Sequence, residues 1–228
     1  MRKSYVKITG MERTVHCTDA IEWLSSQNVL TGCSLVGSLP DISQFPGMSL
    51  SDWGQWFRDT AGLILEKTPE DGISFFFQSD IKLEGLWVDK AFLVQRAAFE
   101  RGIPQLFHKI VCRYPVGTIT FGRPAYSHVL AFSRKIRPDL GKSSPDVLPD
   151  TGEKTWARGM GLDVALMIGN YVLTQSQTRT IVNPFCGQGS MLAAANFLGL
   201  GAIGIERSPK RAEAARTLKV APEGRSFE

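Results

Sequence analysis

The stretch TIVNPFCGQGSMLAAAN, which runs from Thr180 to Asn196, decides the fold of this 228-residue chain. An apolar run leads into two glycines one residue apart, Gly187 and Gly189, and small residues follow from Ser190. This order predicts a buried strand, a tight turn and the start of a helix. Glycine lets the backbone of such a turn approach a ligand without a Cβ atom in the way. The first turn of the helix then offers unpaired N–H groups to a carboxylate or a phosphate.

A second apolar run, Ala202 to Ile205, ends on an acidic residue, Glu206. A carboxylate at the tip of a strand beside the glycine turn is placed to accept hydrogen bonds from ribose hydroxyls. The two runs together predict a site for a cofactor that contains a nucleoside. They do not fit a nicotinamide dinucleotide, because Leu192 replaces the third glycine of that fingerprint. The sequence GLGAIG at 199–204 matches the fingerprint by letter, but it follows a predicted helix and enters a strand, the reverse of the required order.

The segment NPFCGQGS at 183–190 resembles the DPFxGxGT motif of S-adenosylmethionine-dependent methyltransferases, specifically of the DNA amino-methyltransferase group. Further segments are similar to motifs of the circularly permuted members, in which the catalytic motif precedes the cofactor motif: Val15–Leu24, Ser38–Asp41, Ser127–Arg134, Thr155–Leu173 and Ser208–Leu218. The resemblance therefore covers nearly the full length of the chain. It implies an α/β fold of the Rossmann-like class I methyltransferase type, with a mostly parallel sheet flanked by helices and an antiparallel hairpin at one edge.

The periodicity of the sequence independently predicts alternating strands and helices. Short apolar runs indicate buried strands at 14–17, 30–36, 72–78, 106–112, 128–132, 180–182 and 202–205. Apolar residues at helical spacing indicate helices at 50–67, 87–101 and 161–174. Alternation of this kind predicts a parallel sheet. The turn-rich segment 114–126 lies between two strands without a helix, so we expect it to join them as an antiparallel hairpin.

We expect one domain, because 228 residues with 43% hydrophobic composition suffice for one sizeable core and are too few for two. The resemblance implies a catalytic half at about 1–132 and a cofactor-motif half at about 155–228. The segment between them, 133–154, is rich in proline, serine and glycine and is predicted to be a flexible loop. No apolar run is long enough for a membrane span and none follows Met1–Tyr5, so we expect a cytoplasmic protein, or a nuclear one in a eukaryote.

By the resemblance, the loops that follow three of the strands hold the cofactor S-adenosyl-L-methionine. The residues implied for it are Asp19, Asn183, Pro184, Phe185, Cys186, Gly187, Gly189, Ser190, Glu206 and Arg207. Asp19 is expected near the adenine, although its position fits an N-cap of the following helix equally well. Cys186 is expected to be a pocket residue and not a nucleophile, because nothing in the sequence marks a base paired with it. The four cysteines and three histidines show no metal-ligand spacing, so no metal site is predicted.

The segment Ser38-Leu39-Pro40-Asp41 stands where the family carries DPPY or SPPY. The resemblance implies that it holds the target amine in line with the methyl donor. Leu39 replaces a proline of the family, and Asp41 replaces the aromatic residue that stacks on an extruded base, so a ring would have to come from Phe45, Trp53 or Trp56. A carboxylate at 41 is expected to accept a proton or a hydrogen bond from the substrate. The alternative is that the segment is an ordinary turn, and Gln78–Asp80, which also ends a strand on polar residues, is then the next candidate.

A formal net charge of +4 and local clusters of basic residues favour a polyanionic partner, which we expect to be nucleic acid. The cluster Arg134, Lys135, Arg137 and Lys142 is expected to contact the substrate, whereas the one in the C-terminal helix is as well explained by a solvated surface. Only about twenty residues, 133–154, are free to read a base sequence, too few for a major groove, so RNA is preferred to DNA as substrate. The alternatives are a DNA amino-methyltransferase and a catalytically degenerate subunit that binds S-adenosylmethionine or its product without transferring methyl.

Overall fold

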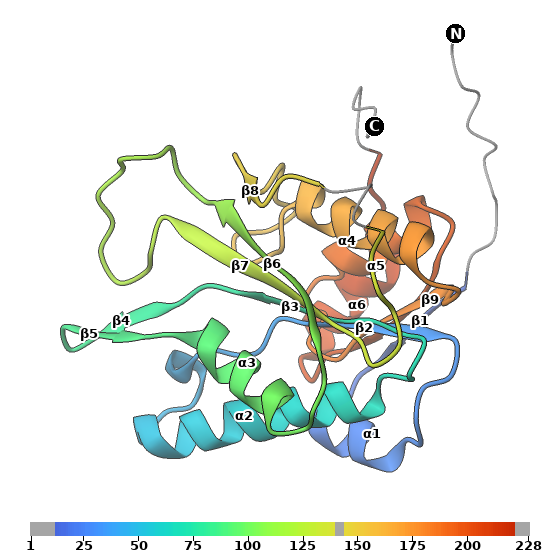
Figure 1. Ribbon diagram of the computed structural model, residues 1–228, viewed down its shortest axis with the longest axis horizontal. Helices are drawn as coiled ribbons and strands as arrows, with labels where there is room; N and C mark the ends of the chain where they lie inside the picture. Colours follow the sequence, from blue (N-terminus) through green and yellow to red (C-terminus); the bar gives the residue numbers. More distant parts are fainter. Residues whose placement is uncertain (1–11, 140–143, 222–228) are drawn as a thin grey trace, which may run out of the picture.

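The computed structural model describes residues 12–139 and 144–221. The centre of this part of the chain is an eight-stranded sheet with the order β1-β10-β9-β2-β3-β7-β6-β8 (Figure 1). Its strands are β1 (Arg13–His16), β2 (Cys33–Gly37), β3 (Ser74–Gln78), β6 (Gln105–Cys112), β7 (Tyr126–Phe132), β8 (Val147–Leu148), β9 (Thr180–Asn183) and β10 (Gly201–Ile205). Every strand predicted from the apolar runs is present, with ends that differ by a few residues.

The sheet is parallel over its first five strands. β1, β10, β9, β2 and β3 run the same way, and β7 runs against both β3 and β6. The predicted antiparallel hairpin is therefore confirmed as β6 and β7, joined by residues 113–125. It does not form the edge of the sheet, because the short strand β8 pairs in parallel with β6 on its outer side.

Helices cover both faces of the sheet (Figure 1). One face carries α1 (Ala20–Ser26), α2 (Leu50–Lys67) and α3 (Lys90–Phe99), and the other carries α4 (Leu162–Gln175), α5 (Ser190–Phe197) and α6 (Pro209–Thr217). Each face has its own buried cluster, which includes Trp53 and Phe57 of α2 on the first and Leu166 and Leu192 on the second. No helix within the described ranges is long and apolar enough to cross a membrane.

A second, two-stranded sheet follows β3 and was not predicted. Ile81–Leu83 (β4) pairs antiparallel with Leu86–Val88 (β5). The turn between them is Glu84-Gly85, and both residues have positive φ, 50° and 79°. A two-residue turn of this kind matches the twist of the flanking strands, which explains why a hairpin forms here.

The helix predicted at 87–101 consequently begins later than expected. It starts at Lys90 as α3, after Asp89, whose carboxylate caps its first turn. The strand β3 ends at Gln78, at the same edge of the sheet as the carboxyl ends of β2 and β9. The β4–β5 hairpin is short, so α3 begins close to this edge. Lys90, the first residue of α3, therefore lies at the edge of the sheet where the predicted site residues lie.

The segment 133–154, predicted to be a flexible loop, pairs with the sheet in its second half. Val147 and Leu148 form β8, and Lys109 of β6 lies 3.2 Å from the carboxylate of Asp146. The outer edge of β6 offers backbone groups with which Val147 and Leu148 pair. The flexibility of the segment stays a prediction. Residues 140–143, which include Lys142, lie outside the described residues, as do Met1–Tyr5.

The basic cluster expected to contact the substrate lies at the opposite edge of the sheet from the residues predicted for the cofactor and the target amine. Its described members are Arg134, Lys135 and Arg137. They follow Phe132, which pairs with Ser74 at the start of β3, so they lie at the amino ends of the parallel strands. Arg134 donates to two main-chain carbonyls at the end of α2, and Lys135 forms an ion pair with Glu70. Contact of these residues with the substrate stays a prediction.

Candidate functional site

A cavity of about 900 Å³ opens at the carboxyl ends of the parallel strands, where the loops after β1, β2, β9 and β10 converge. Its volume lies within the roughly 300–1,000 Å³ typical of small-molecule sites. Every residue predicted for the cofactor or the target amine lines the cavity except Gly189, namely Asp19, Ser38, Leu39, Pro40, Asp41, Asn183, Pro184, Phe185, Cys186, Gly187, Ser190, Glu206 and Arg207. The structure therefore brings together two motifs that are far apart in the sequence.

The two glycines of the turn after β9 have different environments. Both have positive φ, 56° at Gly187 and 87° at Gly189, a conformation that favours glycine. A Cβ atom at Gly187 would come within 2.6 Å of the ring of Trp156, which also lines the cavity. A Cβ atom at Gly189 would come within 2.8 Å of the Cα atom of Ala215 in α6. Gly189 thus permits close packing of α5 against α6 and does not line the cavity, and the role expected for it at the ligand stays a prediction.

Side-chain hydrogen bonds hold the turn in place. The side-chain oxygen of Asn183 accepts a hydrogen bond from the N–H of Phe185 at 3.2 Å, which fixes the exit from β9. The hydroxyls of Ser190 and Thr155 lie 2.6 Å apart. The second contact ties the start of α5 to the segment that precedes α4, so the cavity wall is built from both sides.

Glu206 lies at the tip of β10, as predicted, with 9% of its surface exposed. One carboxylate oxygen accepts a hydrogen bond from the N–H of Ser208 at 2.9 Å and lies 3.8 Å from Arg211. These contacts orient the carboxylate in the cavity wall. Burial, together with the charge of Glu206, raises the pKa of Cys186 to about 12, so Cys186 remains a neutral thiol and lacks the thiolate that a nucleophile needs.

Asp19 is the N-cap of α1, since its side chain accepts hydrogen bonds from the N–H groups of Ile21 and Glu22. It also lines the cavity. The capping role is confirmed. Contact with a cofactor stays a prediction that is compatible with it.

The Ser38–Asp41 segment turns its residues to different sides. Leu39 has only 4% of its surface exposed and packs mainly in the core beneath α2. The carbonyl oxygen of Pro40 accepts a hydrogen bond from the indole of Trp53 at 3.4 Å. Ser38 and Asp41 remain as the polar side chains of the segment that face the cavity.

Asp41 is buried and pairs with two cations that the sequence did not predict for the site. One oxygen, Oδ2, lies 3.8 Å from Nζ of Lys90 and accepts a short hydrogen bond from Arg123. The other oxygen, Oδ1, is buried and has no hydrogen-bond partner among the described residues. The segment is therefore more than an ordinary turn, because its last residue joins the β2 loop to α3 and to the β6–β7 loop.

Lys90 has only 2% of its surface exposed. Burial lowers the pKa of Lys90 to about 8, against the opposing effect of the Asp41 carboxylate. A lysine at the first position of a helix carries no motif, so nothing in the sequence marked this residue for selection. A hairpin recognised at the Glu84-Gly85 turn would have moved the predicted start of the next helix to a position after Asp89, and Lys90 would then have been its first residue.

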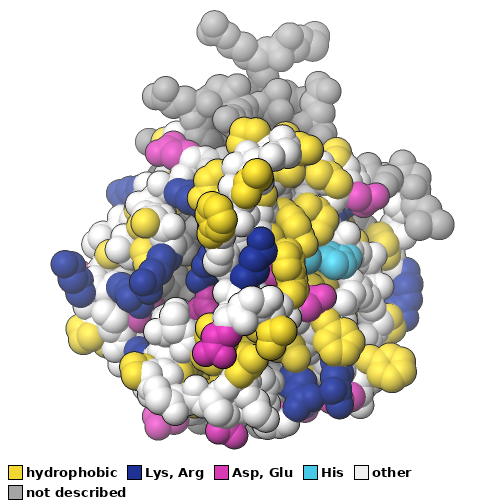
Figure 2. All heavy atoms as spheres, turned by 90° about the vertical axis from the view of Figure 1, so that its left-hand side faces the viewer, with side chains coloured by type: hydrophobic (Ala, Val, Ile, Leu, Met, Phe, Trp, Pro, Cys, Tyr) yellow, Lys and Arg dark blue, Asp and Glu magenta, His cyan; other side chains and the backbone are white. Residues whose placement is uncertain are grey.

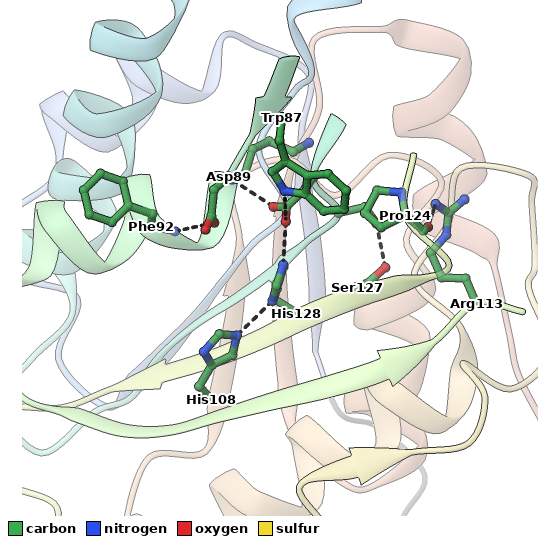
Figure 3. A network of polar contacts seen from close by, with 11 residues as sticks. Trp87, Asp89, Phe92, His108, Arg113, Pro124, Ser127 and His128 are labelled. Atoms are coloured by element: carbon green, nitrogen blue, oxygen red, sulfur yellow. Dashed lines mark hydrogen bonds and ion pairs between the residues drawn. The ribbon is translucent and has the colours of Figure 1, made fainter. Parts of the chain in front are cut away.

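A network of polar contacts, with His128 between His108 and the start of α3, bonds the main chain of Lys90 through Asp80 (Figure 3). Asp80 accepts hydrogen bonds from the indole of Trp87 at 3.1 Å and from the N–H of Lys90 at 2.9 Å. It also bonds Nε2 of His128 at 3.0 Å, and Nδ1 of His128 bonds His108 at 2.8 Å. Burial alone would raise the pKa of Asp80, but the hydrogen bonds from His128 and its other donors hold it below the ordinary value. The network fixes the start of α3 and hence the position of Lys90.

The next candidate segment, Gln78–Asp80, is only partly at the cavity. Gln78 and Ser79 line it, whereas Asp80 belongs to the network behind it. Asp80, Asp89 and His128 lie close enough to share a cation. Each of these groups is already used, since Asp80 and His128 bond each other and Asp89 caps α3, so we assign them a structural role.

Aromatic rings form one wall of the cavity. The rings of Phe45 and Trp56 lie 4.6 Å apart, and that of Phe185 lies 6.4 Å from Trp56. All three residues line the cavity, whereas Trp53 is fully buried in the core. Of the rings considered in place of an aromatic at 41, Phe45 and Trp56 are thus available and Trp53 is not.

Further basic residues surround the same cavity, and of these only Arg211, in the basic cluster of the C-terminal helix, was singled out from the sequence. They are Arg113, Arg123, Lys154, Arg158 and Arg211. They come from the β6–β7 loop, from the segment before α4 and from α6. The cationic groups closest to the site thus belong to elements other than the basic cluster that follows β7.

No family model matches this chain, and no curated protein matches its sequence. Solved structures do share its fold. The PvuII DNA methyltransferase (cytosine-N4-specific) has a TM-score of 0.72 at 17% identity, with 91% of this chain and 87% of that chain covered. A putative DNA modification methylase from Thermus thermophilus, complexed with S-adenosyl-L-methionine, has a TM-score of 0.66 at 18% identity, with 90% and 92% covered. The M1.HpyAVI–SAM complex has a TM-score of 0.61 at 14% identity, with 90% and 98% covered. The chain therefore has the Rossmann-like fold of class I methyltransferases, as the resemblance implied.

Proposed function

We propose that this chain transfers the methyl group of S-adenosyl-L-methionine to an amino group of a base in nucleic acid, and that the nucleic acid is DNA. The observation that carries the proposal is one cavity lined both by the Asn183–Ser190 turn with Glu206 and by the polar side chains Ser38 and Asp41. The fold supports the same function, because it is shared with methyltransferases and with two proteins that were solved with S-adenosyl-L-methionine bound.

The residues at one end of the cavity fit the cofactor chemically. Glu206 offers a carboxylate to ribose hydroxyls. The N-terminal turn of α5 has no side-chain cap and suits the carboxylate of the methionine part. Phe185 and Trp156 give this end of the cavity aromatic walls. The bound cofactor supplies an electrophilic methyl group on a sulfonium, and the chain supplies the alignment of the acceptor.

We assign the alignment of the amine to Ser38 and Asp41. Oδ1 of Asp41 is a buried acceptor without a partner in the described part of the chain, a state that costs about 1–3 kcal/mol and that an N–H group of the substrate would relieve. The amine nitrogen would gain the methyl group as the bond between that group and the sulfonium breaks, which would leave the cofactor as a neutral thioether. The proton that the amine loses would pass to the carboxylate of Asp41, which lines the cavity. Holding the amine in line, away from water, is the larger contribution to the rate. The rings of Phe45 and Trp56 then replace the missing aromatic at 41 as the surface for the base.

We favour DNA over RNA as the substrate, because the short length of this chain, from which RNA was preferred, does not distinguish it from proteins described as DNA methylases. This chain covers 93% of the putative DNA modification methylase from Thermus thermophilus, so chains of about this length occur among proteins described as DNA methylases. Within the 133–154 segment, Val147 and Leu148 pair with β6, whereas most residues of the 113–125 loop beside the cavity are exposed. RNA remains the other outcome of the test.

A second candidate function is a subunit that binds the cofactor or its demethylated product without transferring methyl. The observation that favours it is the pairing of Asp41 with Arg123 and Lys90, which uses one oxygen of the carboxylate. The two functions differ in a simple way. Both predict cofactor binding, and only the first predicts a methylated base.

Mass spectrometry of nucleosides tests the proposal in cells. Bulk DNA and RNA are compared between cells with the gene, cells without it, and cells that carry a Ser38→Ala copy. The proposal predicts an N-methylated base in DNA that is lost on deletion and reduced by the substitution. A loss confined to RNA would move the substrate to RNA. Identical nucleosides in all three strains, from a protein that binds S-adenosylhomocysteine, would favour the non-transferring subunit.

A further inference from the structure

The face of the molecule that carries the β4–β5 hairpin and the β6–β7 loop exposes large apolar side chains (Figure 2). In the loop, Val116, Ile119 and Phe121 have 93%, 83% and 91% of their surface exposed. In the hairpin, Leu86 and Trp87 are also exposed. A cluster of this kind is costly in water and usually marks a binding surface. We call these five residues the apolar lobe.

Hydrogen bonds and an ion pair hold the two segments of the apolar lobe to each other and to the rest of the protein. The N–H of Lys82 in β4 donates to the carbonyl of Gly122 at 2.7 Å, and its Nζ donates to the carbonyl of Thr120 at 3.2 Å. Arg123, at the end of the loop, pairs with Asp41. The hairpin and the loop enclose a second cavity of about 700 Å³, and Asp41 lies in the walls of both cavities. Two members of the apolar lobe, Ile119 and Phe121, therefore line a cavity that adjoins the main one.

Cationic side chains accompany the apolar ones. Arg113 and Arg123 line both cavities, and Lys82 lines the second. Figure 2 shows Lys and Arg side chains distributed among the hydrophobic ones on this face. A partner that suits both has regularly spaced negative charges beside flat apolar surfaces, which describes the phosphates and bases of nucleic acid.

The position of the proposed target base, inside the main cavity, suggests a function for the apolar lobe. Ser38 and Asp41 line the inside of the main cavity, so a base in a duplex must leave its stack to reach them. Leaving the stack exposes the neighbouring bases. Apolar side chains that enter the gap replace the lost stacking, as in proteins that insert wedges between base steps.

We propose that Val116, Ile119 and Phe121 insert into the base stack of duplex DNA and hold it open while the target base occupies the main cavity. This inference rests on the proposed function, since it needs a base to be the target. It adds the element that opens the duplex and the kind of contact it makes. The rest of the apolar lobe and the nearby cations dock on the flanking backbone and bases.

The test uses the full chain and a DNA duplex with 2-aminopurine beside a candidate target base, because the fluorescence of this analogue rises when it unstacks. The variant is Ile119→Ser with Phe121→Ser. The matched control is Phe99→Ser, because Phe99 is 85% exposed and ends α3 at the opposite end from Lys90. Since all three side chains are exposed, thermal unfolding should not change. We expect the double variant to lose the fluorescence rise and to bind DNA about tenfold or more weakly, while the control behaves as wild type and all bind S-adenosylhomocysteine equally.

The outcomes separate this inference from the function on which it rests. If the wild-type chain binds S-adenosylhomocysteine but neither binds nor methylates nucleic acid, the proposed function itself fails. If wild type binds, unstacks and methylates DNA and the double variant does so equally well, the inference alone is overturned. It is also overturned if the substitutions abolish self-association or binding to anionic vesicles while DNA binding stays as in wild type.

Discussion

At position 41 a buried carboxylate stands where the resemblance places an aromatic ring. Asp41 joins three parts of the chain, because it follows β2 and pairs with Lys90 of α3 and Arg123 of the β6–β7 loop. Removing one partner of a buried ion pair leaves the other charge without compensation. The residue is thus expected to matter for stability and for the substrate, and the two effects can be separated.

We expect Asp41→Ala to reduce the free energy of unfolding by about 3–5 kcal/mol, because the buried Lys90 loses its counter-ion and must either stay charged without compensation or give up its proton. It should also slow methyl transfer by about ten- to a thousand-fold, the range of a lost positioning or proton-accepting group. Adding Lys90→Met should restore part of the stability and none of the rate. Ser38→Ala should slow transfer with little loss of stability. Urea unfolding beside single-turnover rates checks this, and a double variant that regains the full rate would show that Asp41 is only structural.

Lys90 gives the protein a pH dependence of known sign. Its pKa in the folded chain is about 8, below the 10.5 of an unperturbed lysine. Between these values the unfolded chain binds more protons, so the free energy of unfolding should rise as the pH increases from about 8 to about 10. The rise should be smaller in Lys90→Met. Urea unfolding at several pH values measures it, and parallel profiles for the two proteins would contradict the burial of this amine.

Glu206 is the residue on which the cofactor assignment most depends. Glu206→Ala should weaken binding of S-adenosylhomocysteine by about 1–3 kcal/mol, the range of hydrogen bonds to a charged group. Glu213→Ala, in an exposed pair with Arg216 on α6, is the control and should leave affinity unchanged. Calorimetry gives both values. Equal affinities for the two variants, or tighter binding of NAD than of S-adenosylhomocysteine by wild type, would contradict the assignment.

Among the elements, the turn between β9 and α5 shows how two glycines of one motif serve different ends. Gly187 lies under Trp156 in the cavity wall, and Gly189 lies against Ala215 of α6. Sequence alone places both at the ligand, since the motif does not reveal which glycine a neighbouring helix approaches. The packing of α5 against α6 depends on the tertiary structure, which the motif does not encode.

Gly189→Val should therefore act on stability first. A branched side chain at φ 87°, with backbone of α6 within 2.8 Å of its Cβ, forces α6 away from α5. The melting temperature should fall by several degrees or more, whereas the fraction that remains folded should keep its affinity for S-adenosylhomocysteine. Differential scanning calorimetry with titration at low temperature checks this. Normal stability with abolished binding would instead support the role at the ligand that the sequence predicted.

The elements that the sequence predicted are those with strong periodicity. Apart from β8, the strands of the main sheet follow from apolar runs and helices α2 and α4 from apolar spacing, because burial on the sheet requires both. The β4–β5 hairpin was missed because its strands are three residues each, too short for a pattern. β8 was missed because it forms only when β6 offers an edge, and nothing in a Pro-, Ser- and Gly-rich segment signals that.

The predictability of the site follows the same division. The cofactor half rests on one contiguous motif, so Asn183 to Ser190 and Glu206 could be placed at the cavity in advance. The acceptor half depends on side chains that meet only in three dimensions. Lys90 and Arg123 reach Asp41 from 49 and 82 positions away, and no spacing rule links them.

For the molecule as a whole, the position of charge matters more than its sum. The net charge of +4 pointed to a polyanion, but Arg134, Lys135 and Arg137 lie at the amino ends of the parallel strands. Arg113, Arg123 and the other cations around the cavity lie at the carboxyl ends, with the apolar lobe. One edge of the sheet therefore combines the cofactor turn, the acceptor residues and a surface suited to nucleic acid.

Transfer of a labelled methyl group by the purified chain tests the central claim most directly. The protein is incubated with S-adenosyl-L-methionine labelled in the methyl group and with duplex DNA or RNA, and the label is located after digestion to nucleosides. Our account predicts label on an amino group of a DNA base, strongly reduced by Ser38→Ala and by Glu206→Ala and unchanged by Glu213→Ala. Absence of label from DNA and RNA alike, from a protein that binds S-adenosylhomocysteine, would contradict it.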